Sequence, residues 1–186
     1  MPATGISDQA VATLWSQAAK EAEAFWPYRL QTDITVAQVK ALRAAPGVRV
    51  YGDPQDRGVF VCRPGFLPEL PPTDATNPPG GKAIELVIWY VVPGLDEPTY
   101  RTVITGLFDM WLRDEIKRGE FTYGFGCMPE NMPEKSARWL NDLAKLWTMK
   151  TTRYEDQMGN KWLRFYGVIR EDVLKDLPAP VAVIPK

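Results

Sequence analysis

The chain has 186 residues, of which 45% are hydrophobic and 11% aromatic, enough for one good core and few for two. Its 22 basic and 23 acidic residues give a net charge of −1, so no charge excess favours nucleic acid or an anionic membrane as partner. The sequence has no histidine, which excludes Ser-His-Asp and Cys-His nucleophile pairs and histidine zinc sites. We therefore expect a single domain over residues 1–186.

Neither the first residues, nor any apolar run, nor the cysteines of the sequence indicate secretion, a membrane span or a metal. The first ten residues lack the basic and apolar regions of a signal peptide, and no apolar run approaches the roughly 20 residues of a transmembrane helix. Cys62 and Cys127 are too few for a disulfide framework or a zinc knuckle, and are expected as buried free thiols. We expect a soluble, cytoplasmic protein without a metal site and without a nucleic-acid or membrane partner.

Two amphipathic helices are predicted near the N-terminus. Apolar residues recur at three- and four-residue spacing over residues 10–25, with Ser7 or Asp8 placed as the N-cap. A second, shorter helix begins at Thr35, whose spacing to Gln38 is that of a capping box, and it ends at a Pro-Gly pair.

The hydrophobic period then changes from helical to alternating. Val48, Val50, a turn over residues 52–54 and an apolar run over residues 59–62 predict a β-hairpin. Residues 65–81 are rich in proline, with Asp, Thr and Asn between the prolines, and are predicted to form a long exposed loop without a domain boundary.

The second half of the chain alternates strands with helices. Residues 83–92 are almost continuously apolar, as in a central strand covered on both faces. The remaining predicted elements are an amphipathic helix ending at Gly119, a strand over residues 121–128, a helix over about 133–147, and strands over 149–154 and 162–169 that flank the Gly159-Asn160 turn.

The order of these elements resembles that of the GNAT family of acyl-CoA N-acetyltransferases, which has one extra strand at the start. The sequence YVVP at residues 90–93 is similar to the end of the family's fourth strand, with its typical V-x-P. The resemblance covers about residues 7–170. It implies an α/β fold with a mixed, mostly antiparallel central sheet flanked by about four helices.

The resemblance also implies a coenzyme A site directly after Pro93. In the family an Arg/Gln-x-x-Gly-x-Gly/Ala loop follows, and its backbone amides hold the pyrophosphate at a helix N-terminus. Here residues 95–99 read LDEPT, so that side chains replace glycine, a proline removes one N–H and two carboxylates add negative charge. Asp96 is interpreted as a helix N-cap. If coenzyme A binds, the resemblance assigns it to Val92, Leu95, Pro98 and Thr99.

Candidate catalytic residues follow from the same resemblance. Glu85 lies eight residues before Pro93, where many family members carry a strand glutamate that activates the amine through water. It could instead be a solvent-facing or ion-paired carboxylate. The family's acid is a tyrosine on the last helix, but residues 136–147 contain none, and Tyr123 and Tyr154 would replace it only by coincidence of geometry.

These observations predict a non-catalytic GNAT-like protein that acts through contacts with a protein partner or with a second copy of itself. The apolar tail, residues 177–186, could add as an edge strand to such a partner or fold onto its own sheet. Family members of this size with incomplete sites occur among tailed-phage proteins, which suggests a role in a phage particle or its assembly, in the host cytoplasm or the virion. The alternative is an active acetyl-CoA-dependent N-acetyltransferase with Glu85 as its base.

A third hypothesis, nucleic-acid binding, draws on basic residues interleaved with tryptophan. The residues are Lys145, Lys150, Arg153 and Lys161, with Trp147 and Trp162. The near-neutral net charge and the usual place of tryptophan in cores argue against it, and most of the seven tryptophans are expected to anchor the core.

Overall fold

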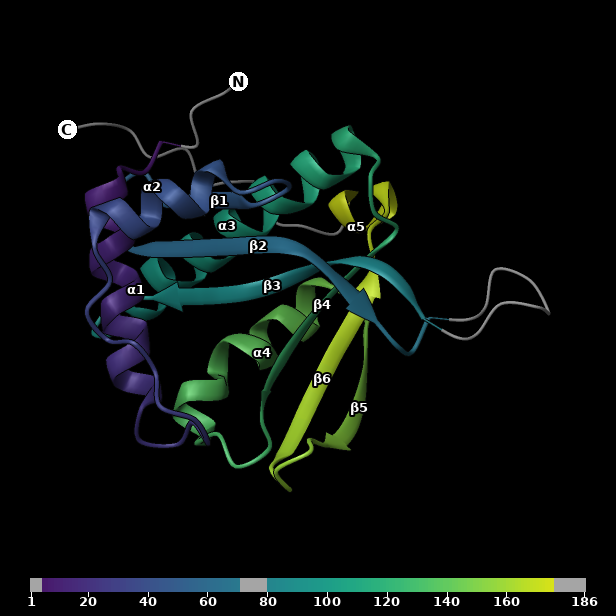
Figure 1. Ribbon diagram of the computed structural model, residues 1–186. Coiled ribbons are helices and arrows are strands. Elements are labelled where there is room, and N and C mark those ends of the chain that lie inside the picture. The colour runs from purple at the N-terminus through teal and green to yellow at the C-terminus, as the bar shows by residue number, and fades with distance from the viewer. Residues whose placement is uncertain (1–4, 71–79, 176–186) are drawn as a thin grey trace.

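The computed structural model describes residues 5–70 and 80–175, which form a mixed sheet flanked by helices (Figure 1). The sheet is six-stranded, in the order β1-β2-β3-β4-β6-β5. Its strands are β1 (Arg49–Gly52), β2 (Gly58–Leu67), β3 (Gly81–Val91), β4 (Tyr123–Pro129), β5 (Met149–Glu155) and β6 (Lys161–Val168). The described helices are α1 (Asp8–Ala22), α2 (Val36–Ala44), α3 (Glu97–Arg118), α4 (Glu134–Leu146) and α5 (Glu171–Lys175). Neighbouring strands are antiparallel except β3 and β4, which are parallel.

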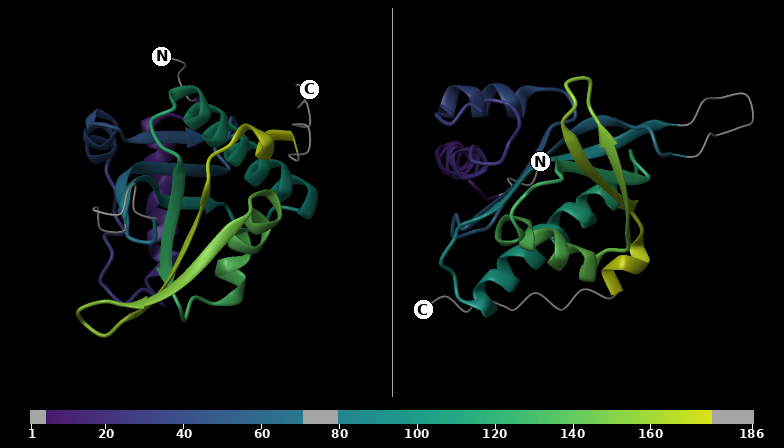
Figure 2. Two further views of the ribbon diagram at one scale, coloured as in Figure 1. Left: turned by 90° about the vertical axis from the view of Figure 1, so that its right-hand side faces the viewer. Right: turned by 90° about the horizontal axis from the view of Figure 1, so that it is seen from below.

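The helices form a layer on each face of the sheet (Figure 2). α1 and α2 cover one face, where Ile88 and Tyr90 of β3 belong to their hydrophobic cluster. α3 and α4 cover the other face, where Ile84 and Leu86 belong to a second cluster. This confirms the prediction that residues 83–92 contain a central strand covered on both faces.

The helix ends follow the capping signals in the sequence. The Ser7 hydroxyl accepts from the Ala10 N–H at 3.1 Å, and Thr35 forms both halves of a capping box at the start of α2. Asp96 is the N-cap of α3, as predicted, and Gly119 ends that helix at φ 62°, a left-handed conformation that glycine adopts without strain.

Two tryptophans of the α3–α4 layer lie directly on the sheet because the strands beneath them carry glycine. A Cβ on Gly124 would come within 2.8 Å of the Trp111 ring, and one on Gly167 within 2.4 Å of the Trp147 ring. Both rings are buried, and they contact each other edge to face at 5.3 Å. Trp111 and Trp147 thus confirm the expectation that tryptophan anchors the core.

The predicted loop over residues 65–81 is wrong at both ends. β2 continues to Leu67 and β3 begins at Gly81, and the two strands pair there. Pro64 is tolerated inside β2 because β1 reaches no further than Cys62, so that the position lies on an open sheet edge where no N–H is needed.

The structure contains one helix that the sequence did not predict, α5 (Glu171–Lys175). Two predicted features fall on residues that the structure does not describe. The middle of the proline-rich loop and the apolar tail lie outside the described residues. Within the described part of the chain, no helix combines the length and apolarity needed to cross a membrane.

Candidate functional site

The site is organised by a split between the two parallel strands. β3 and β4 pair at Ile84↔Gly124 and Glu85↔Phe125, and past these pairs the strands diverge (Figure 1). β3 nevertheless continues to Val91. Among the described residues, the β4-facing edge of β3 over residues 86–91 therefore has no strand partner, which leaves main-chain groups available for a ligand.

A bulge in β3 coincides with the start of this split. Val61 pairs with Ile88 while Cys62 pairs with Leu86, so that Val87 has no partner on β2. A bulged residue bends its strand and increases the local twist. Val87 is also 40% exposed, which is unusual for the middle of a central strand.

A cleft of about 880 Å³ lies at the split. Its lining comes from α1 and the segment after it, from β3, β4 and β6, from the start of α3 and from α4. Ile88 and Tyr90 line it from the α1 face of the sheet, whereas Leu86 and Trp89 belong to the cluster on the α3–α4 face. The cleft therefore reaches both faces of the sheet.

The α1 side of the cleft is aromatic and carries one carboxylate. Trp15, Phe25 and Trp26, here called the aromatic wall, line it together with Glu21. The Tyr90 hydroxyl donates to Glu21 Oε1 at 2.6 Å. Burial of Tyr90, followed by this hydrogen bond, raises the pKa of the tyrosine, so that the hydroxyl remains a donor to the carboxylate.

One member of the aromatic wall, Trp26, and the nearby Tyr28 are fastened to β6 and to the turn before it. The Trp26 ring contacts Trp162 edge to face at 5.4 Å, and the Tyr28 ring stacks on the same tryptophan at 6.2 Å. The Tyr28 hydroxyl donates to Asp156, which also accepts from Trp162 Nε1 at 2.9 Å. These contacts hold the segment after α1 in place beside the cleft.

The α4 side of the cleft carries two basic residues, of which Arg138 is ion-paired with Glu97 and Asp142. Lys135 and Arg138 line it, and the Arg138 guanidinium lies 4.0 Å from the Tyr100 ring centroid. Trp139 stacks on Trp89 at 5.1 Å and joins α4 to β3. Burial raises the pKa of Tyr100 to about 12, so that its hydroxyl stays protonated further into the alkaline range than that of an exposed tyrosine.

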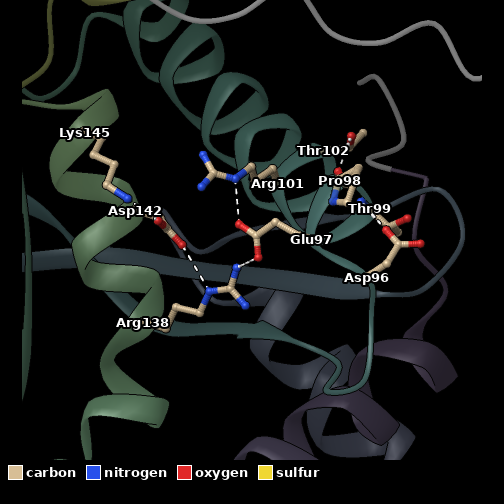
Figure 3. Close-up of polar contacts among 9 residues, drawn as sticks. All are labelled: Asp96, Glu97, Pro98, Thr99, Arg101, Thr102, Arg138, Asp142 and Lys145. Carbon is tan, nitrogen blue, oxygen red and sulfur yellow. Dashed lines mark hydrogen bonds and ion pairs between the residues drawn. The ribbon is translucent and has the colours of Figure 1, made fainter.

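The N-terminus of α3 is occupied by its own carboxylates (Figure 3). Asp96 Oδ1 accepts from the Thr99 N–H at 2.8 Å, and Pro98 has no N–H. Glu97 pairs with Arg101 at 2.7 Å and also with Arg138 of α4. The N–H donors that would hold a phosphate at a helix N-terminus are thus reduced, and the Asp96 carboxylate lies where a phosphate would bind.

The residues that the sequence assigned to a coenzyme A site are divided by the structure. Val92 and Leu95 line the cleft, whereas Pro98 and Thr99 belong to the first turn of α3 and are not part of its lining. The fit to coenzyme A is therefore partial. The cleft has an apolar lining for the pantetheine arm, but residues 95–99 lack the glycine-rich turn that binds the pyrophosphate in the GNAT family.

Glu85, the residue that the sequence assigned as base, lies beside the split but not in the cleft lining. It stands opposite Arg63 in the β2–β3 register, and the two side chains form an ion pair at 2.7 Å. This is the alternative that the sequence left open for it.

Sequence reasoning missed three polar side chains that line the cleft, those of Glu21, Tyr90 and Lys135. One signal was available: a carboxylate in the last turn of a helix opposes the macrodipole, and Glu21 is in that position in α1.

The other predicted site residues do not assemble into a second site. Trp147 and Trp162 are buried, so their faces are not available for stacking on bases. Cys62 is a buried free thiol as expected, whereas Cys127 is only half-buried and lines the cleft. The described residues contain no cluster of three His, Cys, Asp or Glu that could hold a metal ion.

No protein-family model matches the sequence, and no curated protein matches it significantly. Solved structures do resemble the fold. A Desulfovibrio desulfuricans protein assigned to the GNAT family of acetyltransferases superposes with a TM-score of 0.54 at 15% identity, covering 89% of this chain and 96% of that one. A Chromobacterium violaceum protein assigned to the same family gives a TM-score of 0.53 at 12% identity, covering 88% and 84%. At such identities the likeness establishes the fold alone, and it confirms the predicted mixed, mostly antiparallel α/β fold of GNAT type.

Proposed function

We propose that the chain is an acyltransferase that moves an acyl group from a thioester to a primary amine. The observation that carries the proposal is the cleft at the β3–β4 split, because it opens to both faces of the sheet. Two molecules can enter it from opposite sides and meet inside, which converts a bimolecular reaction into one between positioned groups. The amine nitrogen attacks the thioester carbonyl, the C–N bond forms, the C–S bond breaks, and the thiol leaves with a proton.

The charges lining the cleft agree with two such substrates. Glu21 lies on the α1 side, and Lys135 and Arg138 lie on the α4 side. A carboxylate attracts an ammonium ion, and the Lys135 ammonium group attracts an anionic donor, which could also compete for Arg138 with its partners Glu97 and Asp142. The amine therefore enters from the α1 side and the thioester from the α4 side.

Main-chain and side-chain groups then have separate tasks. The unpaired edge of β3 over residues 86–91 offers N–H and C=O groups to the amide and carbonyl groups of the donor. The Glu21 carboxylate, held by the Tyr90 hydroxyl, binds the ammonium ion and accepts the proton that the amine loses.

Acetyl-CoA is the first donor to test. Val92 and Leu95 would contact its pantetheine arm, and Lys135 and Arg138 would face its phosphates. Because Asp96 and Glu97 oppose phosphate at the α3 N-terminus, we expect weaker binding of the nucleotide part than a glycine-rich turn provides.

The test is a thiol-release assay with acetyl-CoA and a panel of primary amines. We expect release with at least one amine and its loss in Glu21→Gln, whereas Glu23→Gln, a change one residue beyond the end of α1, retains it. Glu85→Gln is the decisive comparison: if it abolishes release while Glu21→Gln does not, the base is the one assigned from the sequence. No release with any amine at millimolar acetyl-CoA would refute the proposal.

A second candidate, a non-catalytic protein that acts through protein contacts, is favoured by the carboxylates at the α3 N-terminus. Calorimetric titration with acetyl-CoA and coenzyme A separates the two: absence of heat at millimolar ligand, together with no thiol release, leaves the second candidate. Deletion of residues 177–186 then tests whether the tail mediates association. The phage setting stays a prediction.

A further inference from the structure

We infer that the amine acceptor is a monoamine carried on an aromatic or similarly bulky apolar group, and that it binds between the aromatic wall and Glu21. The inference rests on the proposed acyl transfer and names its acceptor class. It is carried by the side chains on the α1 side of the cleft, which are distinct from the donor side formed by α3 and α4.

The number of charges decides between kinds of amine. Three charged residues line the cleft, and of these only Glu21 is acidic. One carboxylate matches one ammonium group, whereas a polyamine or a lysine-rich peptide would bring further positive charge to a lining whose other charges are Lys135 and the ion-paired Arg138. The site therefore selects a single ammonium group.

The apolar surface around Glu21 decides what the ammonium group is attached to. The aromatic wall, Trp15, Phe25 and Trp26, is joined there by Leu30 and Ile34. Tryptophan faces attract both an ammonium ion and an apolar ring. A small amine such as ethylamine would leave this surface in contact with water, whereas an aryl or branched alkyl group would cover it.

One member of the wall, Trp26, is held in place without a ligand. Trp26 and Tyr28 both contact Trp162 of β6, and the Tyr28 hydroxyl donates to Asp156 of the turn before that strand. A pocket whose side chains are already ordered does not lose their conformational entropy on binding. It can therefore distinguish amines by shape as well as by charge.

The experiment measures amine binding to the full chain without any thioester, by calorimetry or tryptophan fluorescence. The probes are 2-phenylethylamine, ethylamine (charge without ring), 2-phenylethanol (ring without charge) and spermidine (several charges). We expect 2-phenylethylamine to bind about tenfold or more tightly than each of the others, since one charge-assisted hydrogen bond or one buried ring changes affinity by that order. Glu21→Gln should lose about tenfold in affinity for it, and the matched change Glu23→Gln should lose none.

Equal binding of ethylamine, or tighter binding of spermidine, overturns the inference, and so does unchanged affinity in Glu21→Gln. An unchanged melting temperature establishes that Glu21→Gln is folded; should it not fold, the ligand series on the wild-type chain decides alone. The two proposals fail separately. Binding of 2-phenylethylamine through Glu21 without any thiol release refutes the enzyme, whereas acetylation of spermidine in preference to 2-phenylethylamine refutes only the acceptor class.

Discussion

The substitution Glu115→Gln should remove a pH dependence of folding stability. Glu115 of α3 is fully buried, and the cation nearest to it is the buried Arg49, whose Nε lies 3.1 Å from Oε1. Arg49 also pairs with Glu120 at 2.7 Å, so that its charge is shared between two carboxylates. Burial, only partly offset by Arg49 and reinforced by the neighbouring Asp114, raises the pKa of Glu115 from 4.5 to about 7.

The sign and size of the effect follow from that pKa. Between pH 4.5 and pH 7 the folded state binds more protons than the unfolded state at this residue, so stability falls as pH rises through that window and is constant above it. A pKa raised from 4.5 to about 7 corresponds to about 3 kcal/mol in total, since a tenfold change in the protonation equilibrium is about 1.4 kcal/mol. Glutamine keeps the shape of the side chain and does not titrate.

The assay is urea denaturation of the wild-type chain and of Glu115→Gln at several values between about pH 5 and about pH 8. We expect the wild type to lose about 2–3 kcal/mol relative to the variant across this range. Other titrating groups affect both proteins alike, so the difference isolates Glu115. Glu120→Gln is the control on the exposed partner of Arg49. A wild-type-minus-variant difference that does not change with pH would refute the reasoning.

Three further changes test the α3 N-terminus, the tryptophan packing and the fastening of the aromatic wall. Asp96→Gly removes the N-cap carboxylate, and should lower the melting temperature slightly while strengthening acetyl-CoA binding in a calorimetric titration; weaker binding would show that the carboxylate does not oppose the donor. Gly167→Ala places a Cβ against the Trp147 ring and should cost about 1–3 kcal/mol in denaturation, whereas Gly106→Ala, in open space on α3, should be neutral or stabilising by up to about 1 kcal/mol. Tyr28→Phe removes the hydroxyl that bonds the β5–β6 turn, and should speed amide hydrogen exchange over residues 23–34; unchanged exchange would mean that ring stacking alone fastens this segment.

Much of the fold was predictable because its signals are local. The Thr35–Gln38 capping box, the Asp96 N-cap and the Gly119 C-cap each depend on residues within one helical turn. The turn at Gly159, with φ 80°, likewise reflects the conformational freedom of one residue. Where the prediction of the loop over 65–81 was wrong, the reason was not local: residues 65–67 belong to β2 because they pair with residues 81–83 of β3.

The site was less predictable, since it depends on which strands pair and where they stop pairing. Glu85 was assigned as base from its place along β3, but the register sets it opposite Arg63, and the two form an ion pair instead. The same register contains the bulge at Val87, where the split from β4 begins. The hydrophobic period along β3 cannot show where its pairing with the neighbouring strand β4 ends.

By itself the sequence determined the order, type and approximate bounds of the elements other than α5, together with the fold class and the mismatch at the α3 N-terminus, because propensity, capping and hydrophobic period act over a few residues. Only the tertiary structure decided what lies in the cleft. Glu21 and Tyr90 are 69 residues apart in the chain and meet because α1 packs across β3. Lys135 reaches the opposite side because α4 covers the other face of the sheet. A contact between distant residues is set by how layers pack.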